Sequence, residues 1–227
     1  MNVLIACEES QRVCGEFRRL GHNAFSCDIE ICSGEHLNWH IQHDVLDILN
    51  GGNFTTSDGV EHEIDKWDLI IAHPPCTYLC VSGNRWFNVE RYGMKAIERY
   101  KLRDKAVEFF MTIAGCNCEH IAIENPIGVM STIYRRPDQI IQPYMFNDPV
   151  RKATCLWLKN LPPLTPTGIV EPNIVHYTCK NGKHVSFSDY MVRNYKASER
   201  SKHRSKTFPG IAQAMAEQWS EYLKEVL

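Results

Sequence analysis

No apolar run in this sequence reaches the roughly 18 consecutive residues of a membrane-spanning helix. The first residues, Met1 to Ala6, lack a basic region and pass directly into an apolar run, unlike a signal peptide. Internal repeats and low-complexity tracts are also missing. We therefore expect a cytoplasmic protein with no membrane partner, whose ten cysteines are mostly thiols rather than disulfides.

A strong overall charge is absent as well, because the net charge is only −2. The charges are nevertheless unevenly distributed along the chain. Residues 1–150 hold 13 Lys and Arg against 21 Asp and Glu, a net charge of −8, whereas residues 151–206 hold 11 against 3, a net charge of +8. An acidic body with a basic region suits contact with a phosphate backbone, and a solvated basic loop is the equally weighted alternative.

The stretch from Trp67 to Cys80 carries the clearest structural and chemical signals. Its apolar run, Leu69 to Ala72, predicts a buried strand of a parallel sheet, which ends at Pro74 and Pro75 because proline offers no backbone donor. Cys76 follows at the carboxyl end of this strand, where open α/β sheets bind ligands. Two interpretations of Cys76 remain open: a nucleophilic thiol held by the rigid Pro-Pro segment, or a thiol packed in the interior.

The remaining chain alternates between strand and helix patterns, which predicts an α/β fold with a doubly wound, mostly parallel sheet. Further strands are expected at Val3 to Ala6, Asn23 to Cys27, Ile121 to Ile123 and Arg151 to Leu158. Helices are expected at Glu9 to Leu20, closed by Gly21, at Val89 to Ala114 with a break near Gly93, and at Ile211 to Leu227. Between them we expect a short element from Asp44 to Asp47, a loop or hairpin over 50–65, a mobile loop from Val81 to Trp86 and an irregular basic segment over 160–206.

Two predicted strands end in reactive side chains followed closely by proline. Cys76 follows Pro74-Pro75, and Glu124 begins the sequence Glu124-Asn125-Pro126 after the next buried strand. Because the carboxyl ends of parallel strands share one edge, the thiol and the carboxylate are expected to lie close together. A helix-capping acid or an ion-pair partner is the alternative role for Glu124.

Several short segments, in the same order along the chain, are similar to motifs of the cytosine-C5 DNA methyltransferases. They span nearly the whole chain: Leu4-Ile5-Ala6-Cys7-Glu8-Glu9-Ser10, Cys27-Asp28-Ile29-Glu30, Asp44-Val45, Pro74-Pro75-Cys76 with Ser82-Gly83, Glu124-Asn125-Pro126, Arg151-Lys152 and Thr207-Phe208-Pro209. The resemblance implies a Rossmann-like methyltransferase fold. It also implies methyl transfer from S-adenosylmethionine to carbon 5 of cytosine in DNA.

The resemblance assigns roles to individual residues. It implies that Cys76 adds to carbon 6 of the base, that a neutral Glu124 assists at N3, and that Arg151 contacts the base carbonyl or a phosphate. For Arg151, a structural ion pair is the alternative role. For Asp28, which is expected on the cofactor ribose, a plain turn residue is the alternative. The cofactor-binding residues implied in this way are Ala6, Cys7, Glu8, Glu9, Ser10, Asp28, Ile29, Asp44, Val45, Pro74 and Thr207.

The resemblance also implies three parts of the chain. Residues 1–159 form the catalytic and cofactor-binding core, 160–206 form a small basic lobe, and 207–227 form a helix that packs back on the core. DNA is expected to bind through the basic region 151–206 and to present a flipped base. The short lobe predicts a short recognition sequence, loose specificity or a partner that supplies it.

The first loop departs from the family pattern, which is glycine-rich and carries an aromatic residue. Ile5 stands at the aromatic position, and Cys7, Glu8 and Ser10 replace glycines. Glu8 and Glu9 could grip the amino group or sulfonium of S-adenosylmethionine. They could equally indicate another donor, or none. The alternatives are therefore a related pyrimidine-C5 modifying enzyme with a different donor or a nucleotide substrate, and a non-catalytic DNA-binding relative.

Metal binding is a weaker possibility at two places, and no metal ligand is assigned. Cys116-Asn117-Cys118-Glu119-His120 has one spacing of potential ligands, and His176, Cys179 and His184 have another. Neither contains the paired Cys-x-x-Cys pattern of structural zinc sites. Cys80 is expected to be a packed thiol rather than a redox partner of Cys76.

Overall fold

The computed structural model describes residues 1–179, 181–182, 184–188 and 203–227. Its central feature is a seven-stranded sheet with the order β3-β2-β1-β6-β7-β9-β8. The five strands from β3 to β7 run parallel, whereas β9 is antiparallel to both β7 and β8. The strands are β1 Asn2–Ala6, β2 Asn23–Asp28, β3 His40–Gln42, β6 Leu69–Ala72, β7 Ile121–Pro126, β8 Gln139–Ile141 and β9 Thr154–Lys159.

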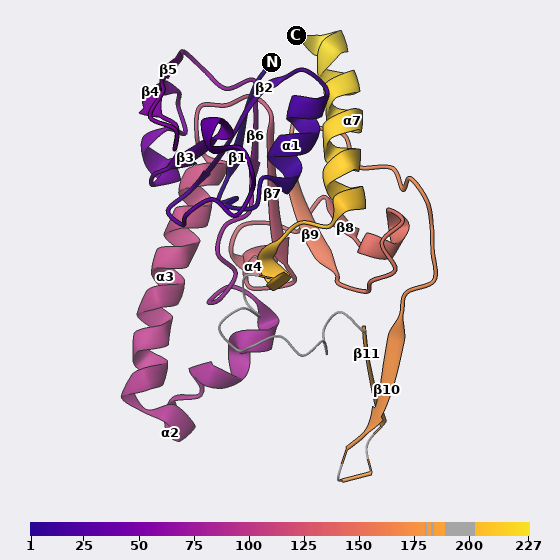
Figure 1. The fold of residues 1–227 in the computed structure, drawn as a ribbon. Helices are drawn as coiled ribbons and strands as arrows, with labels where there is room; N and C mark the ends of the chain where they lie inside the picture. The colour runs from indigo at the N-terminus through magenta and orange to yellow at the C-terminus, as the bar shows by residue number, and fades with distance from the viewer. Residues whose placement is uncertain (180, 183, 189–202) are drawn as a thin grey trace.

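Helices cover both faces of this sheet (Figure 1). Helices α1 (Arg12–Arg19) and α7 (Pro209–Val226) lie side by side on one face, and α3 (Met94–Ala114) covers the other. Successive residues of β1 point to opposite faces, so Val3 packs in the core beneath α1 and α7 while Leu4 packs in the core beneath α3. The α/β fold with a mostly parallel sheet is therefore as predicted.

The strand order reverses between β1 and β6. Helix α1, which follows β1, lies on one face, and α3, which follows β6, lies on the other. In open α/β sheets, such a reversal opens a crevice at the carboxyl ends of the two strands, where ligands bind. Ala6 ends β1 and Ala72 ends β6 at this point.

Three element boundaries differ from the sequence predictions. Helix α1 begins at Arg12 rather than Glu9, because Gln11 adopts a left-handed backbone conformation with φ 58°. Glu124 lies within β7, where it pairs with Leu156, rather than after the strand. Strand β9 begins at Thr154, so Arg151 precedes it.

Other predicted elements are present. The segment 50–65 holds a hairpin of β4 (Gly52–Thr55) and β5 (Glu61–Ile64), and the long helix is broken at Gly93, with φ 51°, into α2 (Val89–Tyr92) and α3. The stretch expected as a mobile loop forms the 3-10 helix η3 (Val81–Phe87). The remaining short helices are η1 Leu37–Trp39, η2 Val45–Asp47, α4 Met130–Ile133 and η4 Pro143–Met145.

The segment 160–206 is not wholly irregular. Strands β10 (Ile174–Thr178) and β11 (His184–Ser188) form an antiparallel hairpin that extends beyond the carboxyl edge of the sheet (Figure 1). Six of the eight Lys and Arg residues of 160–206 lie at positions 180, 183 and 189–202, outside the described residues. In the part of the chain that the structure describes, no helix has the length and apolar character required to cross a bilayer.

Candidate active site at the carboxyl edge of the sheet

The loop that follows β6 is fixed to both neighbouring strands. The backbone N–H of His73 donates to the Ala6 carbonyl at the end of β1, at 2.9 Å. On the other side, the Asn125 side-chain amide of β7 donates to the Pro74 carbonyl at 2.7 Å. Pro74 is buried and Cys76 is partly exposed, so the rigid turn presents the thiol at the ligand-binding edge.

His73 links this loop to Glu124, and the sequence interpretation did not include it. Its Nδ1 lies 3.2 Å from Glu124 Oε2, and the side chains of His73 and Glu124 are only 7% and 15% exposed. Burial by itself raises the pKa of Glu124, but the hydrogen bond and charge of His73, with help from Lys152, outweigh burial and lower this pKa. The carboxylate form is favoured, which differs from the neutral Glu124 expected from the sequence.

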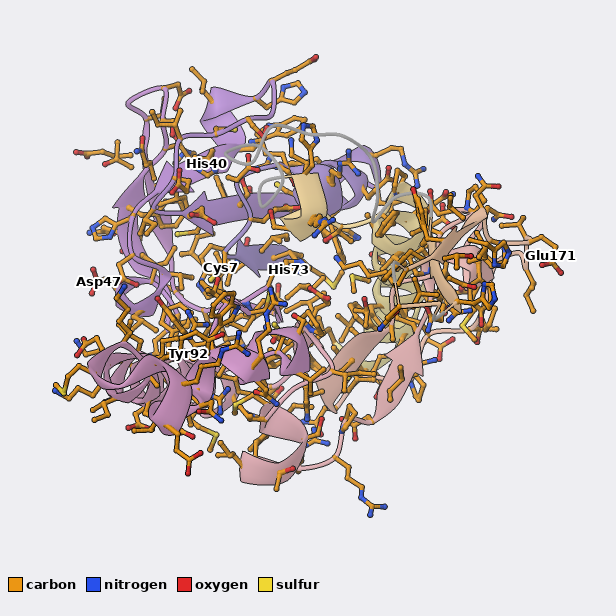
Figure 2. All side chains as sticks on the ribbon, turned by 90° about the horizontal axis from the view of Figure 1, so that it is seen from below. Cys7, His40, Asp47, His73, Tyr92 and Glu171 are labelled. Carbon is orange, nitrogen blue, oxygen red and sulfur yellow. The ribbon has the colours of Figure 1, made fainter. Side chains whose placement is uncertain are left out.

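Two buried polar atoms beside this pair have no hydrogen-bond partner among the described residues: His73 Nε2 and Asn125 Oδ1. Buried polar groups are nearly always paired, so such atoms mark positions where a ligand or water completes the network. Both residues adjoin Pro74, which stands two positions before Cys76: His73 precedes it in the chain and Asn125 donates to its carbonyl. Figure 2 shows His73 beside Cys7 near the centre of this edge.

The residues expected to bind a cofactor gather at the ends of β1, β2 and β3. Cys7 follows β1 in a left-handed conformation with φ 59°, which glycine adopts without strain. Burial, and then the nearby charges of Asp28 and Asp44, raise the pKa of the Cys7 thiol. The structure therefore brings Cys7, Asp28 and Asp44 together. Ala6 and Val45 are buried next to them in sequence, and Ile29 is exposed.

Asp28 and Asp44 are positioned by local turns. One oxygen of Asp28 accepts the Glu30 N–H at 2.9 Å, and Asp44 accepts the Leu46 N–H at 3.0 Å at the start of η2. For each carboxylate, the second oxygen makes no hydrogen bond with a described residue, so it can accept from a ligand hydroxyl or amine. Burial raises the pKa of Asp28.

Glu8 has a structural role that the sequence interpretation missed. Its buried carboxylate accepts from the backbone N–H groups of Val13 at 2.8 Å and Cys14 at 3.1 Å. It also accepts a long hydrogen bond from the Ser10 hydroxyl. Both oxygens thus serve the amino-terminal end of α1, rather than the amino group or sulfonium of a cofactor. The adjacent Glu9 carbonyl accepts the Ser33 N–H at 2.9 Å.

The segment Arg151-Lys152 lies at the same edge, because β9 runs antiparallel to β7 and Thr154 pairs with Pro126. The Arg151 side chain is exposed and makes no ion pair or hydrogen bond with any described residue. Lys152, rather than Arg151, is the cation whose charge reaches Cys76 and Glu124. Its position next to Arg151 was the only sequence signal for this role.

Thr207 lies against the start of α1, where its carbonyl accepts from Arg12 Nη1 at 3.0 Å. This contact and that of Lys206 with Ser33, at 3.0 Å, hold the segment before α7 near the first loop. The groove beside α1 that includes Ser10, Arg12 and Trp39 does not include Cys76 or Glu124, so it is separate from the candidate site.

The potential metal ligands do not form a cluster. Cys118 and His120 contact the backbone carbonyls of Trp67 and Asp68, before β6 begins. In the β10–β11 hairpin, His176 pairs with Ser186 and His184 with Thr178. Over the described ranges, no group of three or more His, Cys, Asp or Glu is placed to hold a metal ion.

No protein family model matches this chain, and a search of curated proteins finds no match.

Proposed function

We propose that this chain is a DNA cytosine-C5 methyltransferase, which acts through a covalent bond between Cys76 and carbon 6 of the base. One observation carries this proposal: the loop that bears Cys76 and the His73–Glu124 pair lie together at the carboxyl edge of the sheet, beside the reversal of strand order between β1 and β6. A thiol, a buried carboxylate and a proton-bearing imidazole at one ligand-binding edge suit addition to an electron-poor ring.

The chemistry requires a nucleophile because carbon 5 of cytosine does not itself attack a methyl sulfonium. Addition of the Cys76 thiolate to carbon 6 raises the electron density at carbon 5 and at N3. In the tautomer in which His73 Nδ1 donates to Glu124 Oε2, the pair can stabilise the developing charge at N3 by passing this proton to the carboxylate. Glu124 is thus protonated only during this step, when N3 of the base needs a hydrogen-bond donor.

S-adenosylmethionine would supply the electrophilic methyl group. The free oxygens of Asp28 and Asp44 suit the ribose hydroxyls and the adenine amine, and the left-handed turn at Cys7 brings backbone close to the crevice. The strand order, in which a reversed β9 separates β7 from β8, is compatible with a Rossmann-like methyltransferase fold. Glu8 is excluded from direct contact by its role at α1.

DNA is the proposed acceptor because of the +8 charge over residues 151–206 and the exposed Arg151 at the site edge. A target cytosine within a duplex would have to leave the stack to reach Cys76, which is half-buried.

The decisive experiment measures transfer of tritium from methyl-labelled S-adenosylmethionine to DNA of mixed sequence. We expect label in DNA with the wild type, none with Cys76→Ala, and normal labelling with Glu61→Gln, which alters an exposed residue of β5. DNA containing 5-fluorocytosine should trap the wild type covalently and not Cys76→Ala. Absence of label, together with no S-adenosylmethionine binding by calorimetry, would refute the proposal.

Free deoxycytidine monophosphate serves as a parallel acceptor in the same assay. Label in the nucleotide but not in DNA would favour the alternative of a pyrimidine nucleotide enzyme. DNA binding with no label in either acceptor would favour the non-catalytic relative.

A further inference from the structure

The groove beside α1 has a volume of about 540 Å³, which is in the range of sites that hold small molecules. It runs between α1 and the segment from Gly34 to Trp39. Of the residues assigned above to catalysis or to the cofactor, only Ser10 lines this groove. Methyl transfer therefore leaves the groove without a role.

Three guanidinium groups line the α1 side of the groove: Arg12, Arg18 and Arg19. Two of them are fixed by backbone carbonyls, since Arg12 Nη1 donates to Thr207 at 3.0 Å and Arg18 Nε donates to Ala24 at 2.6 Å. A guanidinium carries five N–H donors in a planar fork that matches phosphate. Arg12 and Arg18 therefore keep donors for an anionic ligand.

The groove is positively charged, although residues 1–150 together have a net charge of −8. Glu16 and Glu217 both pair with Arg19, at 2.8 and 2.9 Å, and Glu35 on the opposite wall is exposed. Arg12 and Arg18 form no ion pair with any described residue. Their charges are available to a phosphate group.

The opposite wall of the groove is aromatic. The rings of His36 and Trp39 stack with their centroids 3.6 Å apart, and the Arg18 guanidinium lies 5.4 Å from the Trp39 ring centroid. Trp39 covers one face of the His36 ring, and because His36 is exposed, its other face is open. A planar nucleobase can stack on that face and extend the series of rings.

Gln11 holds the two walls at a fixed spacing. Its side-chain Nε2 donates to the His36 carbonyl at 2.6 Å, and its Oε1 accepts the His36 N–H at 3.1 Å. A Cβ atom at Gly34 would collide with the Gln11 side chain, so this close approach requires glycine. The groove is thus formed before a ligand arrives, which lowers the entropic cost of binding.

Gly15 lies on the groove in the middle of α1, where glycine is a poor helix former. Its φ is not positive, and a Cβ atom at this position would meet nothing within 4 Å. Neither the backbone conformation nor the packing therefore requires glycine. The missing side chain leaves the helix surface open to a ligand that lies between Arg12 and Arg18.

We propose that this groove binds a nucleotide, whose phosphate contacts Arg12 and Arg18 and whose base stacks on His36. The ligand is either a free nucleoside monophosphate or one unit of a nucleic-acid strand, since both present the same phosphate and base. The groove is separate from the crevice between β1 and β6, so this binding does not depend on the proposed methyl transfer.

Calorimetric titration of the full chain with deoxyadenosine monophosphate tests the proposal. Deoxyadenosine, which lacks the phosphate, and inorganic phosphate, which lacks the base, should each bind at least about 10-fold more weakly than the nucleotide. Arg12→Gln and His36→Ala, both at exposed positions, should each weaken nucleotide binding by about 10-fold. No binding of the nucleotide, or equal affinity for inorganic phosphate and the nucleotide, would overturn the proposal.

Gly15→Leu separates ligand binding from folding, because leucine is a good helix former that fills the groove. It should abolish nucleotide binding, while the melting temperature stays equal to or above that of the wild type. Arg136→Gln removes the same charge as Arg12→Gln from an exposed position outside the groove, and it should bind as the wild type does. Wild-type affinity in Gly15→Leu, or equal losses in Arg12→Gln and Arg136→Gln, would contradict a site in this groove.

A short single-stranded oligodeoxynucleotide distinguishes the two sources of the nucleotide. If it binds more tightly than the monophosphate, with the same losses in Arg12→Gln and Gly15→Leu, the groove holds a strand; binding of the monophosphate alone assigns the groove to a free nucleotide.

S-adenosylmethionine distinguishes the groove from the proposed cofactor site. Because it carries a sulfonium and no phosphate, it should not displace the nucleotide, and Asp28→Asn should bind the nucleotide as the wild type does. Displacement by S-adenosylmethionine, together with lost nucleotide binding in Asp28→Asn, would place the nucleotide in the crevice between β1 and β6 and overturn the proposal.

Discussion

His73 Nδ1 lies 3.2 Å from the buried carboxylate of Glu124, and the charge of His73 also offsets part of the rise that burial causes in the pKa of Glu8. At the residue scale this makes His73 the group that sets the charge of the site. The lowered pKa of Glu124 means that this carboxylate stabilises the fold above its ordinary pKa. The contribution is lost as the pH falls through the lowered pKa.

We predict that His73→Gln destabilises the protein by about 3 kcal/mol near neutral pH, because it leaves a buried carboxylate without its charged partner. In this variant burial raises the pKa of Glu124, so protonation relieves the penalty as the pH falls. The difference from the wild type should therefore shrink between pH 7 and pH 5. Urea unfolding at both pH values measures the difference.

Glu124→Gln and the double variant complete this experiment. Because the amide carries no charge, adding His73→Gln to Glu124→Gln should cost much less than His73→Gln alone. Equal costs in both backgrounds would show that His73 and Glu124 are not coupled.

Single residues were predicted unevenly from the sequence. Cys76 and Glu124 were predicted as site residues because each follows or ends a buried apolar run, which is a local signal. His73 stands in the same run, but its partner is 51 positions away, and only the pairing of β6 with β7 brings the two together. Glu8 was misassigned for a related reason, because the sequence did not show that α1 begins at Arg12.

At the scale of elements, Glu8 acts as the cap of α1. Burial raises its pKa, so its protonated form is stabilising below its ordinary pKa, and this stabilisation is lost as the pH rises through the raised pKa. We predict that Glu8→Ala costs about 2 kcal/mol, since two buried N–H groups lose their acceptor. Glu8→Gln should cost less, because the amide oxygen still accepts.

The pH dependence separates charge from capping. Glu8→Gln does not titrate, so the wild type should gain stability relative to this variant as the pH falls from 7 to 5. Glu16→Gln is the control on the same helix, because its ion pair with Arg19 is exposed and contributes little. Parallel stability curves for the wild type and Glu8→Gln would contradict the raised pKa.

The elements that the sequence did not predict share a physical feature. Strand β8 has only three residues, and β10 and β11 are mostly exposed. None of the three therefore shows the repeating apolar pattern that predicts a strand. The reversed direction of β9 is likewise invisible in its own residues, because burial on both faces gives the same apolar run in either orientation. The long buried strands and helices were predictable because their patterns are local.

At the scale of the whole molecule, cofactor binding should be visible as stabilisation. If the crevice between β1 and β6 holds S-adenosylmethionine, a concentration 100-fold above its dissociation constant should stabilise the fold by about 2.7 kcal/mol. Differential scanning fluorimetry should show a raised melting temperature for the wild type. Asp28→Asn should show a much smaller shift, whereas Glu61→Gln, in the exposed hairpin strand β5, should behave like the wild type. Equal shifts for Asp28→Asn and the wild type would remove Asp28 from the cofactor site.

The two edges of the sheet allow a test of where DNA binds. Arg151 precedes β9 at the carboxyl edge, and Lys66 precedes β6 at the opposite edge; both side chains are exposed. If DNA lies across the carboxyl edge and Arg151 contacts a phosphate, Arg151→Ala should weaken binding to all sequences and reduce the salt dependence of log K by about one unit. Lys66→Ala removes the same charge and should change neither quantity. Fluorescence anisotropy across a salt series measures the affinity and its salt dependence. Equal losses of affinity in the two variants would mean that the net charge of the protein attracts the DNA, and not a contact at the carboxyl edge. A loss confined to particular sequences would instead identify Arg151 as a base contact, because only base contacts carry sequence information.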